Sequence, residues 1–255
     1  MSLEIHPIPA LKDNYIWALV DAGHCVLVDP GEAAGALEFL RRGQLTLAGL
    51  LLTHHHPDHI GGVDRILDQH PAPAWGSNDP RMPSRMIGCA EGDRVTIPEL
   101  ELEFEVLETP GHTTSHVAFV GHGLLFSGDT LFAAGCGRLF EGTPAQMQAS
   151  LDKLAALPDE TKMYCGHEYT LANCRFAHEV EPENEALTER LKRVEKLREA
   201  NRVTLPATLS EERATNPFLR TREPGVIRAA EQRESIPDTA PETVFGVIRR
   251  WKDAL

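Results

Sequence analysis

The residue types that bind metal ions most readily are concentrated in one short segment, residues 53–59, which read THHHPDH. The donors in it are His54, His56, Asp58 and His59. An apolar run that reads as a buried strand precedes the segment, and apolar residues of helical period follow over residues 60–70. Side chains at positions i and i+2 leaving a strand point the same way, so His54 and His56 can converge. Four such donors exceed what one four-coordinate ion takes from so short a loop, which predicts two divalent ions.

Three further donors follow glycines at the ends of other apolar segments. They are His112, Asp129 and His167. Glycine lets the backbone approach a site closely, and polar residues in loops beyond strands often carry function. Each of the three is weak support alone, and a surface histidine cluster without function is the alternative interpretation of residues 53–59. Together they make a metal site the better prediction.

The elements that must position these donors fall into two regions. Strands are expected over residues 15–20, 25–28, 47–53, 100–106, 117–120, 124–127 and 162–165. Helices are expected over residues 33–42, 60–70, 144–157 with Thr143 as N-cap, 184–201 and 243–251. After residue 169 no strand-like alternation occurs. The pattern predicts a mixed α/β domain over residues 1–168 and an α-helical domain over residues 169–255.

Composition excludes several classes of protein. The chain has 255 residues, a formal net charge of −13 and 42% hydrophobic residues, so it can bury a core and repels nucleic acid and anionic lipid. The N-terminus has no signal-peptide pattern, and the longest stretch without Lys, Arg or Glu, residues 112–137, is too polar for a membrane span. The five cysteines form no CxxC pair, which indicates reduced thiols in the cytoplasm. We expect a cytoplasmic monomer that binds neither nucleic acid nor membrane.

Four motifs in order along the chain resemble those of the glyoxalase II (hydroxyacylglutathione hydrolase) family within the metallo-β-lactamase superfamily. They are THHHPDH at 53–59, PGHT at 110–113, GDTLF at 128–132 and GHEYT at 166–170. The resemblance covers essentially the whole chain, helical tail included. It implies an α/β fold in which a four-layer αββα metallo-β-lactamase sandwich is followed by a C-terminal α-helical domain. It also implies a binuclear metal site at one edge of the sandwich.

The ligand set that the resemblance implies uses all seven donors. His54, His56 and His112 would hold the first metal, Asp58, His59 and His167 the second, and Asp129 would bridge the two. Nitrogen and oxygen donors without thiolate accept zinc, iron or manganese, and zinc is the expected ion. Five imidazoles and two carboxylates leave roughly two positive charges on the pair of ions. A bridging water would therefore be largely hydroxide near neutral pH, since one zinc alone lowers its pKa to about 7.

The activity that the resemblance implies is hydrolysis of a glutathione thioester. The substrate would be S-D-lactoylglutathione and the products D-lactate and glutathione, as in the second step of methylglyoxal detoxification. The bridging hydroxide would attack the thioester carbonyl, with Asp58 orienting it and Asp129 holding both ions. The leaving thiol, with a pKa of roughly 8.5 by analogy with cysteine, can depart as thiolate without a dedicated general acid.

Four residues would bind the glutathione moiety by the same resemblance. Arg249 and Lys252 would bind its glycine carboxylate, Arg138 would contact the same tripeptide, and Tyr169 would hydrogen-bond its backbone. By composition alone, Arg249 and Lys252 would only offset a helix dipole, an effect of about 0.3–1 kcal/mol. Phe140 stands where animal members of the family have tyrosine. We therefore expect weaker glutathione binding and unchanged chemistry.

Two other functions fit parts of the pattern. A glutathione persulfide dioxygenase shares much of the motif set and would use one iron and dioxygen, but the helical tail with Arg249 and Lys252 counts against it. A non-catalytic metal-binding or redox-sensing protein would need neither seven ligands nor a glutathione site. Among the other histidines, His55 is expected to be structural or to face solvent, and His116 to have a structural role.

Overall fold

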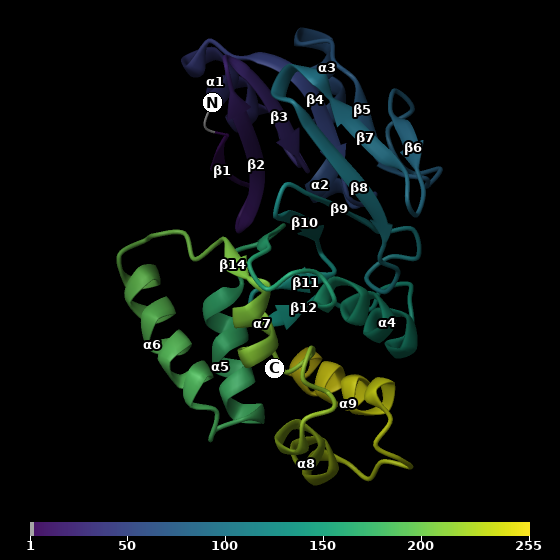
Figure 1. Cartoon of the computed structure of the whole chain (residues 1–255), viewed down its shortest axis with the longest axis vertical. Helices are drawn as coiled ribbons and strands as arrows, with labels where there is room; N and C mark the ends of the chain where they lie inside the picture. Colours follow the sequence, from purple (N-terminus) through teal and green to yellow (C-terminus); the bar gives the residue numbers. More distant parts are fainter. Residues whose placement is uncertain (1–2) are drawn as a thin grey trace. The chain divides into compact units, whose positions relative to one another are not determined.

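The computed structural model describes residues 3–255, and the chain divides into two compact units (Figure 1). The first, which we call the strand unit, contains the described residues up to Glu108 together with Ser115–Gly128 and Tyr164–His167. The second, the helical unit, contains Thr109–Thr114, Asp129–Met163 and Glu168–Leu255. Each unit is therefore built from separate stretches of the chain.

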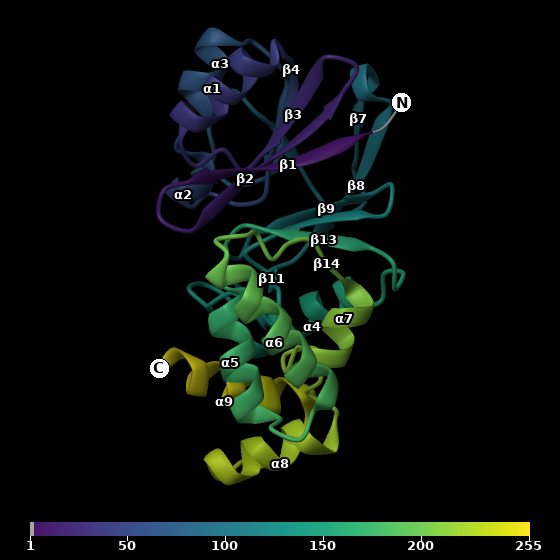
Figure 2. The same ribbon diagram turned by 90° about the vertical axis from the view of Figure 1, so that its left-hand side faces the viewer.

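A six-stranded sheet forms one half of the strand unit, in the spatial order β1 to β6. Its strands are β1 (Glu4–Ala10), β2 (Asn14–Asp21), β3 (His24–Val28), β4 (Thr46–Leu52), β5 (Ala74–Ser77) and β6 (Ile87–Cys89). The first three pair antiparallel, whereas β3 to β6 pair parallel. Helices α1 (Ala33–Gly43) and α3 (Val63–Gln69) lie together on one side of this sheet (Figure 2), and Leu40 and Ile66 share its buried core with Leu27. Parallel strands covered by helices need apolar runs, which β3 and β4 have.

A second sheet of the strand unit holds strands from the middle of the chain. They are β7 (Arg94–Ile97), β8 (Leu102–Glu108), β9 (Val117–Gly121), β10 (Leu124–Gly128) and the end of β13 (Lys162–Cys165). In β8 the buried Leu102, Phe104 and Val106 alternate with glutamates, and Glu103 and Glu105 are exposed, as the sequence predicts. The two sheets meet where Trp17 Nε1 donates to the carbonyl oxygen of Cys165 (2.9 Å), a residue 148 positions further along the chain.

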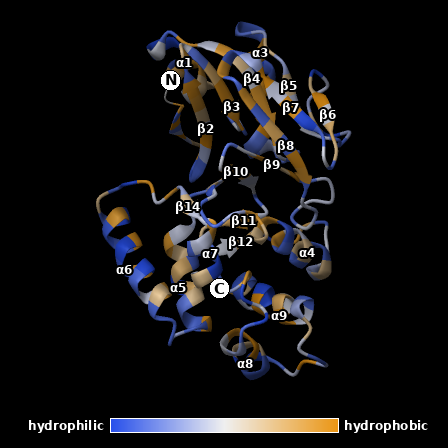
Figure 3. Cartoon of the chain, viewed as in Figure 1, coloured by the Kyte–Doolittle hydropathy of each residue, from blue (hydrophilic) through white to orange (hydrophobic). Residues whose placement is uncertain are grey.

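Helices dominate the helical unit. They are α4 (Pro144–Ala155), α5 (Thr170–Val180), α6 (Glu185–Glu199), α7 (Leu209–Thr215), α8 (Pro224–Arg233) and α9 (Pro241–Asp253), and the short strands β11 (Leu131–Phe132), β12 (Gly135–Cys136) and β14 (Ala207–Thr208) accompany them. Leu187 and Val194 of α6 share an apolar cluster with Cys174 and Ala177 of α5, while much of α6 is hydrophilic (Figure 3). Within residues 3–255, no helix combines the length and the apolar character needed to cross a bilayer.

Most predicted elements are confirmed, with small shifts at their ends. The confirmed elements are β2, β3, β4, β8, β9, β10, β13, α1, α4, α6 and α9. Thr143 caps α4 as predicted, and its hydroxyl accepts a hydrogen bond from the backbone N–H of Gln146 (3.2 Å) in a capping box. The prediction for Leu100 is wrong, because it lies in the 3-10 helix η1 (Pro98–Leu100) and the strand begins at Leu102.

The continuous helix predicted over residues 60–70 is wrong. Helix α2 (Pro57–Ile60) ends where that prediction begins, and α3 starts only after a glycine pair. Both positions require glycine: a Cβ on Gly61 would lie 2.6 Å from the carbonyl oxygen of Gly31, and one on Gly62 would lie 2.5 Å from a backbone carbon. The two glycines therefore let the histidine motif pass close to the chain beyond β3.

One short strand lies beyond residue 169, where the sequence shows no strand-like alternation. Strand β14 pairs antiparallel with β13, with Thr208 opposite Lys162 and Ala207 opposite Met163. Two residues are too few to produce an alternating pattern, so the sequence carries no signal for this strand. Strand β1 was missed for another reason: Pro7 and Pro9 argue against a strand, and β1 tolerates them because it lies at the edge of its sheet.

Candidate metal centre

His54 and His56 lie directly beyond the end of β4 in the strand unit, with ring centroids 4.7 Å apart. His54 Nε2 and His56 Nδ1 are separated by 3.1 Å. Two nitrogens on one tetrahedral zinc stand about 3.3 Å apart, because each Zn–N bond is about 2.0–2.1 Å long. His54 Nδ1 lies 3.0 Å from the hydroxyl of Thr53, which leaves Nε2 for an ion. The structure thus brings these two histidines together, as their i, i+2 spacing predicts.

Asp58, His59 and His167 form a second group of donors in the same unit, and one ligand atom from each lies within 4.8 Å of the others. Asp58 Oδ2 is 3.6 Å from His59 Nε2 and 3.5 Å from His167 Nε2. Donors with this spacing can each lie about 2 Å from a central ion, which is the bond length of a first-row divalent metal. His167 reaches the group from the end of β13, where an antiparallel bridge joins it to Asn14.

Two aspartates hold these histidine rings in the tautomer that a metal requires. Asp29 Oδ2 is 2.9 Å from His59 Nδ1, and Asp13 Oδ1 is 2.8 Å from His167 Nδ1. With Nδ1 protonated and donating to a carboxylate, each ring presents Nε2 toward Asp58. Carboxylate–histidine pairs of this kind orient the ring and raise its basicity toward a metal.

The backbone around Asp29 fixes its carboxylate. The residue follows β3 with a left-handed φ of 49° and is 4% exposed. Its carboxylate accepts hydrogen bonds from the backbone N–H (2.8 Å) and the hydroxyl (2.7 Å) of Thr53. Because β3 and β4 are parallel neighbours, their C-terminal ends meet at one sheet edge, beside the histidine motif. A Cβ on Gly31 would lie 1.8 Å from the carbonyl oxygen of Asp58, so the turn after Asp29 requires glycine.

Asn14 connects two members of the second donor group. Its Nδ2 donates to Asp58 Oδ2 (3.0 Å) and to the carbonyl oxygen of Asp58 (3.2 Å), and it lies 3.5 Å from His167 Nε2. Asp13 and Asn14 are adjacent, at the turn that leads into β2. One short turn therefore positions both Asp58 and His167.

Sequence reasoning missed Asp13, Asn14 and Asp29. A signal was present for Asp29, because residues 28–31 (VDPG) place an acidic side chain where an apolar strand ends, as the other donors do. No comparable signal marks Asp13 and Asn14. Their role depends on pairing with residues about 150 positions away, and the strand that precedes them was itself missed.

The helical unit contains the other two predicted ligands, His112 and Asp129. His112 Nε2 lies 3.5 Å from Asp129 Oδ2, and both residues are buried. His112 Nδ1 donates to the carbonyl oxygen of Arg138 (2.9 Å), which leaves Nε2 facing the carboxylate. Gly137 makes this approach possible, because a Cβ there would lie 2.0 Å from the carbonyl oxygen of Asp129 and 3.0 Å from His112 Nδ1.

The remaining histidines near the motif support it. His55 turns toward Asp79, with Nδ1 3.8 Å from Oδ2. His116 is fully buried and stacks on His54, with ring centroids 4.8 Å apart and an interplanar angle of 28°. These contacts agree with the structural roles expected for both residues.

The donor groups fit divalent transition-metal ions. All seven offer imidazole nitrogen or carboxylate oxygen, which zinc, iron and manganese accept. His54, His59, His112 and His167 are each at most 5% exposed. In the tautomer that the backing acceptors favour, the Nε2 lone pairs of His59 and His167 face the carboxylate of Asp58. A cation between them would replace this repulsion by attraction.

Three of the predicted substrate-binding residues lie near one another in the helical unit. Asp253 Oδ1 accepts a hydrogen bond from Arg249 Nη2 (2.8 Å) and lies 3.2 Å from Arg138 Nε. Lys252, on the same helix, donates to Asn173 Oδ1. Burial and the neighbouring Arg249 guanidinium lower the pKa of the Lys252 ammonium to about 7. We call Arg138, Arg249 and Lys252 the cation cluster.

Two aromatic residues of the helical unit complete the predicted substrate site. Tyr169 directly precedes α5 and packs edge-on against Phe132, with ring centroids 5.4 Å apart. Phe140 is 64% exposed, and its ring lies 5.2 Å from that of His112. An exposed ring beside a predicted metal ligand is available to contact a substrate.

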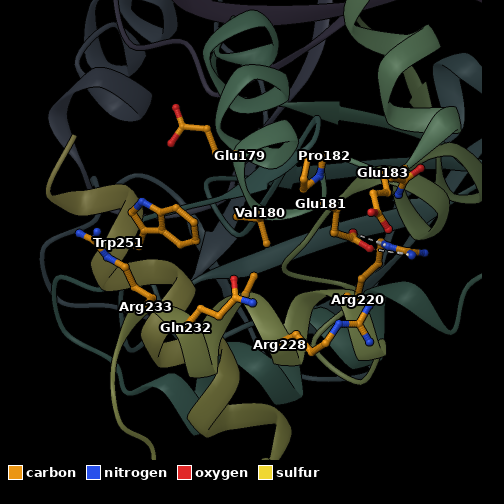
Figure 4. A pocket seen from close by; sticks show the side chains of 13 residues that line it. Glu179, Val180, Glu181, Pro182, Glu183, Arg220, Arg228, Gln232, Arg233 and Trp251 are labelled. Atoms are coloured by element: carbon orange, nitrogen blue, oxygen red, sulfur yellow. Dashed lines mark hydrogen bonds and ion pairs between the residues drawn. The ribbon is translucent and has the colours of Figure 1, made fainter.

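A cavity of about 670 Å³ lies elsewhere in the helical unit, among residues of α5, α8 and α9 (Figure 4). Glu179, Arg233 and Trp251 are among the side chains that line it. The carboxylate of Glu181 accepts two hydrogen bonds from the Arg220 guanidinium (2.7 and 3.0 Å), so these two charges neutralise each other. The residues of the cation cluster are not part of its lining.

Comparison with known proteins identifies the fold. The family model described as Metallo-beta-lactamase superfamily matches residues 12–87 and 90–167. The solved structure of the BLEG-1 B3 metallo-beta-lactamase matches with a TM-score of 0.64 at 26% identity, covering 85% of this chain and 99% of that one. TTHA1623, solved in a di-iron-bound form, matches with a TM-score of 0.56 at 28% identity, covering 64% of this chain and 91% of that one. The protein is a member of the metallo-β-lactamase superfamily and has its α/β fold.

More similar relatives define the family within it. The family model described as Hydroxyacylglutathione hydrolase C-terminus matches residues 168–255. The hydroxyacylglutathione hydrolase of Alkalilimnicola ehrlichii is 52% identical over 252 residues, which cover 98% of each chain. That of Xanthomonas campestris pv. campestris is 53% identical over 254 residues, 99% of each chain. The chain belongs to the hydroxyacylglutathione hydrolase family, so the resemblance of the four motifs and the predicted fold with its C-terminal helices are confirmed.

Proposed function

We propose that the protein hydrolyses S-(2-hydroxyacyl)glutathione thioesters, converting S-D-lactoylglutathione and water to D-lactate and glutathione, as the second step of methylglyoxal detoxification. The observation that carries the proposal is the identity of about half of all positions, over 98% of the chain, with relatives named hydroxyacylglutathione hydrolase. The family match to residues 168–255 supports it, because it includes α9, the helix that carries both Arg249 and Lys252.

We propose further that the chain holds two divalent metal ions. His54, His56 and His112 would ligate one, Asp58, His59 and His167 the other, and Asp129 would bridge them. The spacing of donors within each unit supports this assignment, and so does the di-iron form of TTHA1623. Zinc is the proposed ion, although iron and manganese suit the same donors. When bound, the ions would supply an activated water for attack and polarise the acyl oxygen.

The chain's own side chains would orient the reacting groups. Asp13 and Asp29 hold the Nδ1 protons of His167 and His59, so neither ring can rotate away from the ion it would ligate. Asn14 fixes the carboxylate of Asp58 by donating to Oδ2. So fixed, Asp58 would accept a hydrogen bond from the attacking water and orient it toward the thioester carbonyl.

The cation cluster would bind the glutathione moiety. Arg249 and Lys252 would contact the glycine carboxylate, Arg138 the same tripeptide, and Tyr169 its backbone. Arg249 is 4% exposed, and the carboxylate that it binds belongs to Asp253, whose side chain is 36% exposed. Charge-assisted hydrogen bonds to a carboxylate are strong enough to anchor a flexible tripeptide.

Three broader statements belong to the same proposal. Residues 1–168 would act as the catalytic domain and residues 169–255 as the glutathione-binding domain, which the separate family matches ending at 167 and starting at 168 support. The cytoplasm is the proposed compartment, because all five cysteines are free thiols. We propose a monomer, which size-exclusion chromatography with light scattering would test.

Anaerobic hydrolysis of S-D-lactoylglutathione tests the proposal. Loss of thioester absorbance would be followed without dioxygen, and metal content would be determined on the same sample. We expect rapid turnover and close to two metal ions per chain. No turnover with both ions bound would mean that the substrate is wrong. One iron per chain, with oxygen consumption on glutathione persulfide, would assign the protein to the dioxygenase alternative.

A further inference from the structure

Asp253 lies close to the C-terminus and inside the cation cluster. Its Oδ1 is shared between Arg249 Nη2 (2.8 Å) and Arg138 Nε (3.2 Å). The side chain of Asp253 is 36% exposed, so one side of this carboxylate faces solvent. A carboxylate that bridges two guanidinium groups makes the contacts that an incoming carboxylate would make.

Arg249 is held more firmly than the carboxylate that it binds. Its Nη1 donates to the carbonyl oxygen of Cys136 (2.9 Å), and its guanidinium lies over the ring of Phe218, 5.2 Å from the centroid. Its Nε has no acceptor within residues 3–255, although the residue is 4% exposed. An arginine binds a carboxylate best through two parallel N–H groups, and Asp253 engages only Nη2.

Lys252 adds a third cation, which also faces Asp253. Its ammonium lies 5.7 Å from the ring centroid of Phe176 and 6.0 Å from that of Phe218, and it donates to Asn173. The cluster therefore sets three cationic side chains against the single carboxylate of Asp253. In a chain of net charge −13, such an excess of positive charge is local and would attract an anion.

We propose that Asp253 is an internal competitor for the carboxylate of the substrate, and that binding of the glutathione moiety displaces it from Arg249 and Arg138. The inference rests on the proposed function. Arg249 stays paired during the exchange, because the carboxylate of the substrate takes the place of Asp253, whose 36% exposed side chain moves into water. Competition from Asp253 lowers the affinity of the cation cluster for glutathione, so the product dissociates readily.

The variant Asp253→Asn tests this inference through glutathione binding. Isothermal titration of the metal-loaded protein should give a Kd for glutathione roughly two- to fivefold lower than that of the unsubstituted protein, as expected for loss of a competing carboxylate that is itself 36% exposed. The KM for S-D-lactoylglutathione should fall by a similar factor. Glutathione esterified at its glycine carboxylate should gain nothing from the substitution, because it lacks the group that competes with Asp253.

Glu231→Gln is the matched control, since it removes one negative charge from an exposed position of α8 and should leave both constants unchanged. Asp253→Ala, checked by circular dichroism and metal content, repeats the test with a smaller side chain. Weaker or unchanged glutathione binding in both variants would overturn the inference and mean that Asp253 positions Arg249. If the unsubstituted protein neither binds glutathione nor hydrolyses the thioester, the proposed function itself fails.

Discussion

The histidine groups of the strand unit and the cation cluster of the helical unit both pair their side chains with carboxylates, but these carboxylates differ in exposure. In the strand unit His59 is backed by Asp29, which is 4% exposed and held in turn by Thr53. In the helical unit the counter-ion of Arg249 is Asp253, whose side chain is 36% exposed and faces water. A buried carboxylate such as Asp29 suits a site whose ion stays bound. A partly exposed carboxylate such as Asp253 suits a site whose ligand binds and dissociates.

The difference predicts where substitutions will affect chemistry and where they will affect affinity. Replacing a proposed metal donor of the strand unit should remove metal and turnover together. The buried carboxylates that remain there would otherwise lack a compensating positive charge. Cations whose partner exchanges with solvent should change the binding of the substrate and leave the metal in place.

The largest expected effect is on the predicted bridging ligand. Asp129→Ala should lower kcat/KM on the order of a thousandfold or more and reduce metal content below two ions per chain, because the carboxylate would hold both ions. Thioester hydrolysis and elemental analysis of the same sample measure both. Asp64→Ala, at an exposed position of α3, is the control. Full metal content with full activity in Asp129→Ala would exclude the bridging role.

Removal of two members of the cation cluster should change affinity and spare the metal. Arg249→Ala combined with Lys252→Ala should raise KM roughly a hundredfold, from the loss of two charge-assisted hydrogen bonds, with a smaller change in kcat. Steady-state kinetics and metal analysis measure this. The control is Arg175→Ala with Lys192→Ala, two exposed cations of the same unit. A fall in kcat at constant KM would contradict the binding role.

The turn before β2 should control the affinity of one ion. Asp13→Ala removes the acceptor for His167 Nδ1 and should weaken binding of one metal about 10- to 100-fold, as loss of such partners does elsewhere. Asp13→Asn keeps an oxygen acceptor and should restore part of the affinity. Competition with a chromophoric chelator resolves the two ions. Asp68→Ala, exposed on α3, should not differ from the unsubstituted protein, and equal affinities in all variants would refute the prediction.

The pH dependence of KM should sharpen the contrast between the two regions. Since the pKa of Lys252 is lowered to about 7 by burial and by Arg249, its charge is lost as pH rises through neutrality, and KM should rise up to about tenfold between about pH 6 and pH 8. Asp253 and the Cys136 thiol also face this ammonium. Lys252→Arg, which stays charged, should abolish the rise. An identical pH profile in both proteins would rule out this cause.

The free energy of unfolding should also depend on pH through the protonation of Lys252. The folded pKa of Lys252 lies below its ordinary value of 10.5, so the folded state binds fewer protons than the unfolded chain between about pH 7 and pH 10.5. The free energy of unfolding should therefore rise with pH across this window through Lys252, and Lys252→Met should remove that contribution. Urea denaturation at several pH values measures the slope.

The smallest expected effect is a gain at Phe140. Phe140→Tyr adds a hydroxyl on a 64% exposed ring and should lower KM about two- to threefold, since water competes for such a hydrogen bond. Phe39→Tyr, a half-buried ring on α1, provides the same chemical change at a position without a predicted ligand. An unchanged KM in Phe140→Tyr would mean that the ring contacts no part of glutathione.

The residues proposed as metal donors could be picked out from the sequence because their signal is local. His54, His56, Asp58 and His59 fall within six residues between a strand and a helix start, and the other donors follow glycines at strand ends. The glycine pair after Ile60 shows the limit of that approach. Helical periodicity continues across it in sequence, yet α2 ends at Ile60 and α3 begins only at Val63.

Residues that support the donors were harder to predict because their partners are distant. Asp13 contacts His167, which lies 154 positions away, and Asp253 contacts Arg138 across more than a hundred residues. No pattern of period 2 or 3.6 encodes such pairs. Arg249 and Lys252 were assigned through family resemblance, since a basic last turn of a helix is otherwise ordinary.

The strand unit takes its last residues, Tyr164–His167, from far along the chain, and this has a consequence for biosynthesis. During translation, Trp17 and Asp13 are synthesised long before their hydrogen-bond partners, the carbonyl of Cys165 and the imidazole of His167. Closure over so long a loop is entropically slow. The histidine motif therefore leaves the ribosome well before the donor that completes its second group. If this group binds a metal ion as proposed, it would acquire the ion only after residue 167 has been translated.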